Sequence, residues 1–120
     1  SWIATYQFAR SLTLVAARAC GVLAIDTLHA DFRELDGLAT VAGEARRDGF
    51  DGMMAIHPAQ VPVINDAFTP SAEELAHARR VVAAFESDPD AGAVQLDGRM
   101  LDRPQLALAH RLLQRGSQDR

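Results

Sequence analysis

The stretch GFDGMMAIHPAQV, at positions 49–61, decides the fold predicted for this chain. The glycine at position 49 closes a predicted helix, because glycine readily adopts the left-handed conformation that ends helices. Residues 53–56 form a short apolar run, which is typical of a strand buried on both faces of a parallel sheet. The strand must stop at His57 and Pro58, because proline cannot donate a hydrogen bond to a neighbouring strand.

The residues before this stretch show the same alternation of strand and helix. The apolar run VLAID at 22–26 predicts an earlier buried strand, and residues 35–48 predict a helix between the two strands. Residues 3–20 predict another amphipathic helix, whose apolar positions recur at close to the helical period: Ile3, Phe8, Leu12, Val15, Ala16 and Ala19. This order predicts a parallel α/β sheet. Two parallel strands leave both sheet edges unpaired, so the predicted sheet is incomplete.

The residues after this stretch predict helices and a hairpin. A short helix is expected at 61–67, and a second helix is expected to run to residue 86 from a capping box formed by Ser71 and Glu74. Residues 93–96 and 100–101 predict two strands joined by the turn-forming pair Asp97 and Gly98. Pro104 opens a last predicted helix, which ends near residue 113.

Composition excludes several classes of function. The net charge is −4, so no basic surface favours nucleic acid or anionic lipid as a partner. All 12 basic residues are arginine, so this chain supplies neither a Schiff-base lysine nor a Walker-A lysine. No apolar run is long enough for a transmembrane helix, and no signal peptide is recognisable. The single cysteine, Cys20, cannot form an internal disulfide; we expect it to be buried and the protein to be cytoplasmic.

Four stretches, in order, resemble one enzyme family: AIDTLHADFRELDGL at 24–38, GFDGMMAIHPAQV at 49–61, INDAFTPSAEELAHARRVVAAFE at 64–86 and LDGRMLDRPQLALAHRLL at 96–113. They are similar to the C-terminal portion of citrate lyase β-subunit-like and malyl-CoA lyase proteins, the HpcH/HpaI aldolase family. The resemblance implies the C-terminal part of a (β/α)8 TIM barrel with a C-terminal lid extension. Residues 1–86 would then be the last βα units of the barrel, and 87–120 the lid segment.

The resemblance also implies a chemistry. Members cleave or form the carbon–carbon bond of a 3-hydroxyacyl-CoA thioester such as malyl-CoA or citramalyl-CoA, and Mg2+ stabilises the enolate. The Glu and Asp that hold the metal lie earlier in the barrel, so the resemblance implies that this sequence lacks them. Members form homo-oligomers, and a trimer or hexamer is expected. The alternative is a truncated, non-catalytic homologue that serves as an assembly or binding module.

Asp102 is the candidate catalytic residue. It matches the aspartate of the family's lid motif, which reaches a neighbouring subunit and acts as acid or base toward the substrate α-carbon. An aspartate directly before Arg103 and Pro104 is equally explained as a helix N-cap. Asp97 competes weakly, because a role in the hairpin turn explains it.

The candidate substrate-binding residues follow the two predicted strands. Ile56, His57 and Pro58 end the second strand, and the resemblance implies that they line the CoA channel or shape the loop. His57 could also act as a base or a metal ligand, but no second ligand at suitable spacing is visible. Asp26 ends the first strand, and Asp31 and Arg33 follow on its loop, where they would contact substrate, a neighbouring subunit or one another.

Overall fold

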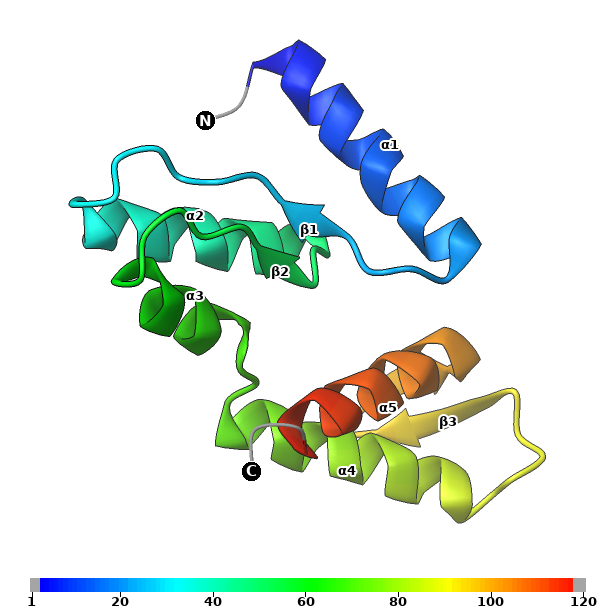
Figure 1. The fold of residues 1–120 in the computed structure, drawn as a ribbon. Coiled ribbons are helices and arrows are strands. Elements are labelled where there is room, and N and C mark those ends of the chain that lie inside the picture. The colour runs from blue at the N-terminus through cyan, green and yellow to red at the C-terminus, as the bar shows by residue number, and fades with distance from the viewer. Residues whose placement is uncertain (1–2, 118–120) are drawn as a thin grey trace. The chain divides into compact units, whose positions relative to one another are not determined.

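The computed structural model describes residues 3–117 of the chain, which divides into two compact units, Ser1–Phe68 and Thr69–Arg120 (Figure 1). The first unit contains α1 (Ala4–Cys20), β1 (Ile25–Asp26), α2 (Leu35–Asp48), β2 (Gly52–Met53) and α3 (Gln60–Phe68). The second contains α4 (Ala72–Glu86), β3 (Ala93–Leu96), β4 (Arg99–Asp102) and α5 (Arg103–Ser117). From the sequence we expected residues 1–86 to belong to the barrel and residues 87–120 to the lid. This assignment stays a prediction.

The first unit is built around a β1–α2–β2 arrangement. The two strands pair in parallel, with Ile25 opposite Gly52 and Asp26 opposite Met53, as the strand–helix–strand order predicts. Helix α2 covers one side of the pair, with its fully buried residues Leu38, Ala42 and Ala45 in the core. The core is completed by residues from the other elements, namely Ala17, Ala24, Phe50, Met53, Ile64 and Phe68.

The predicted strand bounds are wrong. The runs at 22–26 and 53–56 predict longer strands, but the paired residues are only two in each strand. A strand needs a neighbouring backbone along its length, and among the described residues β1 and β2 have only each other. The hydrogen bonds from Asp51 N to Ala24 O (2.8 Å) and from Met54 N to Asp26 O (3.1 Å) extend the contact by little.

Helices α1, α2 and α4 end where the sequence predicts, whereas α5 continues to Ser117, beyond the predicted end near residue 113. Helix α2 has the predicted bounds, and Gly49, at φ 114°, ends it in the left-handed region. Ser71 Oγ accepts a hydrogen bond from the backbone N–H of Glu74, and the Glu74 carboxylate accepts one from the backbone N–H of Ser71, so the predicted capping box opens α4. Caps predict helix bounds well because they depend on residues a few positions apart.

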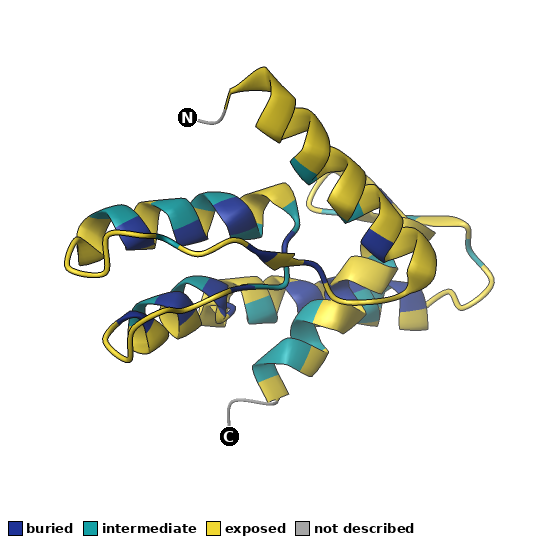
Figure 2. Ribbon diagram, turned by 45° about the horizontal axis from the view of Figure 1, so that its top comes forward, coloured by how far each residue is buried: buried dark blue, intermediate teal, exposed yellow. Residues whose placement is uncertain are grey.

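Helix α1 is confirmed, but its predicted apolar face is uncovered. The side that packs on the unit carries Arg10, Leu14 and Ala17, of which only Ala17 is buried. Phe8 is 67% exposed, Leu12 is 52% exposed and Val15 is 67% exposed. Almost the whole helix is therefore drawn as exposed (Figure 2). Cys20 at its end is also exposed, so the prediction that it is buried is wrong.

The 120-residue chain is therefore expected to associate when isolated at micromolar concentration. The exposed apolar side of α1 continues in Val22, Leu23 and Ile25, and patches of this kind are rare on stable monomers. Analytical ultracentrifugation should find species heavier than 13.0 kDa, and the double substitution Phe8→Gln, Leu12→Gln should shift them toward the monomer. A cooperatively folding, monodisperse monomer of the unsubstituted chain would contradict this expectation.

The second unit packs two helices against a hairpin. Strands β3 and β4 pair antiparallel with Leu96 opposite Arg99, so Asp97 and Gly98 form the predicted two-residue turn. Both turn residues have positive φ, 52° and 78°, as a type I′ turn requires. Buried residues from α4, β4 and α5 form the core: Ala78, Val81, Phe85, Leu101 and Ala109.

Candidate functional site

The candidate site begins at the carboxyl ends of β1 and β2. Because these strands are parallel, their carboxyl ends lie at one edge, where α/β folds place their binding residues. Residues 27–34 follow β1, and residues 54–59 follow β2. We call these the first and second strand-end loops. Together they carry every candidate of the first unit except Asp26, which is the last residue of β1 itself.

One buried glutamine connects the two strand-end loops. Gln60, at the start of α3, is fully buried. Its Oε1 accepts a hydrogen bond from the backbone N–H of Ile56 (2.8 Å), and its Nε2 donates one to the carbonyl oxygen of His29 (3.0 Å). Sequence reasoning missed this residue, although it stands in the quoted stretch three positions after His57.

His57 lies on the exposed side of the second strand-end loop. Its ring stacks on that of Phe32 in the first loop, with centroids 4.8 Å apart and planes inclined by 13°. Its Nδ1 accepts a hydrogen bond from the backbone N–H of Ala59 (3.1 Å), which leaves Nε2 to carry the proton of the neutral ring. The guanidinium of Arg33 lies over the Phe32 ring at 5.2 Å. Phe32 was not singled out from the sequence, because nothing local links it to His57.

The remaining candidates of these loops are exposed. Ile56 is 49% exposed, and Pro58 is also exposed. Asp31 and Arg33 are neighbours through the backbone, since the N–H of Arg33 donates to the Asp31 carboxylate (3.2 Å). Apolar, cationic and anionic groups thus face solvent at the same edge.

Asp26 is buried in an ion pair on the helix side of β1. It is 3% exposed, and its Oδ1 accepts hydrogen bonds from the guanidinium of Arg10 and from the backbone N–H of Thr27 (2.8 Å). Arg10 also lies 3.4 Å from Asp48 and 4.6 Å from the centre of the Phe50 ring. These contacts are those of a structural ion pair, and a substrate-binding role for Asp26 stays a prediction.

Asp102 lies in the second unit, at the start of α5. Its carboxylate accepts a hydrogen bond from the backbone N–H of Gln105 (3.2 Å), and its own N–H donates to the Gln105 side chain (2.8 Å). This reciprocal pair is the N-cap expected from the sequence. The side chain is nevertheless exposed, so capping leaves the carboxylate open to solvent. A catalytic role for Asp102 stays a prediction.

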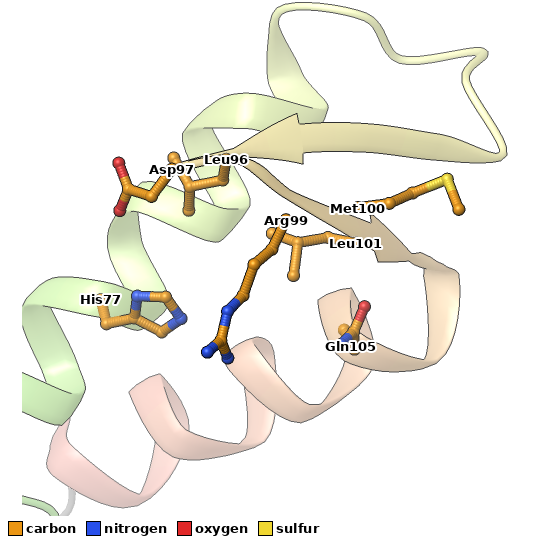
Figure 3. A pocket seen from close by; sticks show the side chains of 7 residues that line it. All are labelled: His77, Leu96, Asp97, Arg99, Met100, Leu101 and Gln105. Carbon is orange, nitrogen blue, oxygen red and sulfur yellow. The ribbon is translucent and has the colours of Figure 1, made fainter.

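A hollow of about 360 Å³ lies beside β4 (Figure 3). The ring of His77 from α4 and the guanidinium of Arg99 extend into it. Asp97, on its border, accepts a hydrogen bond from Arg80 (2.6 Å), which lowers the pKa of that aspartate. Asp97 is therefore tied to a turn and to an ion pair, as its predicted turn role requires. The full lining is His77, Leu96, Asp97, Arg99, Met100, Leu101 and Gln105.

Residues 3–117 contain no cluster of metal-ligating side chains. Within this range, no group of three or more His, Cys, Asp or Glu side chains is arranged to hold an ion. None of the helices in this range combines the length and apolar character needed to cross a membrane.

Comparison with known proteins places the chain beside a group of lyases. No protein-family model matches it. A citrate lyase subunit beta-like protein from Mycobacterium tuberculosis (strain H37Rv) is 44% identical over 109 residues, which cover 91% of this chain and 39% of that protein. The mitochondrial citramalyl-CoA lyase of Rattus norvegicus is 38% identical over 108 residues, covering 88% of this chain and 32% of the rat protein.

A solved structure shows the same similarity in three dimensions. Protein CitE from Mycobacterium tuberculosis, in complex with magnesium, acetoacetate and coenzyme A, superimposes with a TM-score of 0.83 and 41% identity. The match covers 98% of this chain and 43% of that one. The chain therefore spans less than half the length of the proteins it matches.

Proposed function

Because the chain is homologous over most of its length to citrate lyase β-subunit-like proteins, we propose that it forms the C-terminal part of a CoA-ester lyase. The reaction is the reversible cleavage of a carbon–carbon bond in a 3-hydroxyacyl-CoA thioester such as malyl-CoA or citramalyl-CoA. The observation that carries this proposal is the similarity, over 98% of the chain, to a structure bound to magnesium, acetoacetate and coenzyme A.

The proposed fold of the complete protein is a (β/α)8 barrel followed by a lid. The parallel β1–α2–β2 arrangement would be one βα repeat of such a barrel and the strand of the next, and a closed barrel has no sheet edges. Preceding strands and helices would cover the exposed residues Leu12 and Val15 of α1 and Leu23 beside β1. The hairpin and α5 would form the lid.

The chain's own residues would bind substrate and move a proton. The two strand-end loops, with Ile56, His57 and Pro58, would contact the CoA thioester at the carboxyl edge of the strands. The exposed carboxylate of Asp102 would exchange a proton with the substrate α-carbon in the site of a neighbouring subunit of a homotrimer or hexamer. Magnesium, held by preceding barrel residues, would stabilise the negative charge that this proton transfer creates.

The proposal predicts metal-dependent activity of the long polypeptide and none of the short one. A polypeptide of the relatives' length that contains this chain should cleave malyl-CoA or citramalyl-CoA with Mg2+ and lose that activity when the metal is chelated. The 120-residue chain should be inactive with or without Mg2+, because the resemblance places the Glu and Asp that would hold the metal in a part of the barrel that precedes these residues. The assay follows release of the acyl-CoA product by chromatography. Absence of metal-dependent cleavage by the long polypeptide would refute the proposal.

The second candidate function is a non-catalytic assembly or binding module. The observation that favours it is that no group of three or more His, Cys, Asp or Glu side chains within residues 3–117 is arranged to hold an ion. This candidate predicts a discrete oligomer of the 120-residue chain that binds neither Mg2+ nor CoA in calorimetric titrations. Catalytic activity of that chain by itself would exclude it.

A further inference from the structure

We infer that Gln60 is a positioning residue that fixes the two strand-end loops relative to each other. The inference rests on the proposed function only for its kinetic consequence. The structural part stands on two hydrogen bonds, which join Gln60 to Ile56 in one loop and to His29 in the other. No candidate role followed for Gln60 from the sequence, and the proposed chemistry does not use its side chain.

The amide group suits this task because its two ends differ. The N–H of Ile56 needs an acceptor and receives Oε1 at 2.8 Å, while the carbonyl of His29 needs a donor and receives Nε2 at 3.0 Å. A carboxylate would satisfy only the first, and a hydrocarbon side chain neither. Since the Gln60 side chain is fully buried, a backbone group left unpaired here would lose its partner without gaining water.

The connection spans a long sequence distance at a place where strand pairing has ended. His29 precedes Gln60 by 31 residues, and the last paired residues of the two strands are Asp26 and Met53. Beyond that pair, the backbone N–H of Met54 donates a hydrogen bond to the carbonyl oxygen of Asp26 (3.1 Å), which is the last backbone contact between the strands in the described part of the chain. The Gln60 side chain therefore continues the connection outward, into the loops that the ladder cannot reach.

The arrangement held in this way is the exposed face of the candidate site. The Phe32 ring from the first loop stacks on the His57 ring from the second at 4.8 Å, and this contact requires the loops to keep their relative position. Gln60 also binds the second loop through its backbone, since its N–H donates to the carbonyl of His57 (3.0 Å). Loss of the side-chain bonds would free the first loop from the second, and with it the stack.

Hydrogen exchange of the full polypeptide, measured by mass spectrometry, tests the structural part. Gln60→Met removes both side-chain bonds at similar volume and should speed exchange about tenfold or more in peptides covering 27–34 and 54–59. Measured above the pKa of the introduced carboxyl, Gln60→Glu keeps the acceptor for Ile56 and loses the donor for His29, so only 27–34 should exchange faster. The matched control is Gln95→Met, at an exposed position of β3, which should leave both segments unchanged.

If either Gln60→Met or Gln60→Glu fails to fold, the other variant still tests the role of Gln60. Unchanged exchange in both loops of the folded variants would overturn it. Faster exchange throughout α1, α2 and α3 in either variant would also overturn it, because Gln60 would then be an ordinary core residue. Equal effects of Gln60→Glu on both segments would contradict the assignment of one amide end to each loop.

Steady-state kinetics on the same polypeptides test the consequence for the site. The loops are proposed to bind the thioester, whereas Asp102 is proposed to move the proton. Gln60→Glu should therefore raise KM for the acyl-CoA about tenfold and change kcat by no more than about threefold. An unchanged KM with a lowered Tm would overturn the positioning role. Absence of activity in the unsubstituted enzyme would refute the proposed function instead, and the exchange result would still decide the role of Gln60.

Discussion

Replacing Arg10 by methionine is expected to lower the free energy of unfolding by about 3–5 kcal/mol. The Arg10 guanidinium pairs with the Asp26 carboxylate, whose side chain is only 4% exposed. Removing the cation leaves a buried negative charge with one remaining hydrogen-bond donor, the Thr27 N–H. The second carboxylate oxygen, Oδ2, already has no hydrogen-bond partner among the described residues. Urea unfolding of the full polypeptide measures the loss.

Two controls separate charge burial from general damage to α1. Arg18 also lies in α1, and Arg18→Met removes its ion pair with Asp51, the residue before β2. Because the Arg18 side chain is 40% exposed, the expected loss of stability is about 1 kcal/mol or less. The double substitution Arg10→Met, Asp26→Leu removes both charges and should recover much of the stability lost in Arg10→Met. Equal losses for Arg10→Met and Arg18→Met would show that the Asp26 charge is not effectively buried.

Local sequence signals predicted the presence of every helix and of the hairpin turn, although α5 and β4 are longer than predicted. The bounds of α2 follow from Gly49, the start of α4 follows from Ser71 and Glu74, and the hairpin turn follows from Asp97 and Gly98. Each signal acts between residues close in sequence, where backbone geometry and a single hydrogen bond decide the outcome.

Long-range pairing could not be predicted in the same way. The bond between Arg10 and Asp26 spans 16 residues, and that between Gln60 and His29 spans 31. No periodic pattern in the sequence marks either contact, because each is made by one side chain that reaches another element. The ring stack of Phe32 and His57 belongs to the same class. The candidate site was thus located by its strand ends, while the contacts that hold it together were found only in the structure.

The mistaken burial predictions concern apolar residues that nothing covers among the described residues, and the proposed barrel would cover them with preceding strands and helices. The apolar face of α1 and the run at 22–26 both predict burial, yet Leu12 is 52% exposed and Leu23 is 72% exposed. Hydrophobic periodicity predicts which face of an element is apolar, but it does not identify the residues that pack on that face. In the proposed barrel, preceding strands and helices would pack on it. Cys20, at the end of the same helix, is exposed as well.

The aspartate at the start of α5 carries the largest kinetic prediction. In a polypeptide of the relatives' length, Asp102→Asn should lower kcat by about 10²- to 10⁴-fold, the contribution typical of a general acid or base. The substitution removes the charge and proton affinity of the carboxylate but keeps an oxygen that can accept from Gln105 N–H, and asparagine is as good an N-cap as aspartate. Steady-state turnover of the acyl-CoA substrate and the melting temperature are measured together.

A matched substitution separates catalysis from capping. Asp97→Asn removes a carboxylate from the neighbouring hairpin turn, where its partner is Arg80, and should leave kcat within about twofold because such exposed pairs contribute little. If Asp102→Asn keeps its turnover, the residue is an N-cap and proton transfer belongs elsewhere. If both variants lose turnover equally, the loss comes from the hairpin as a whole. A selective loss at Asp102 with an unchanged melting temperature is the result that the lid proposal requires, because only a carboxylate that reaches the substrate is sensitive to the change from oxygen to nitrogen.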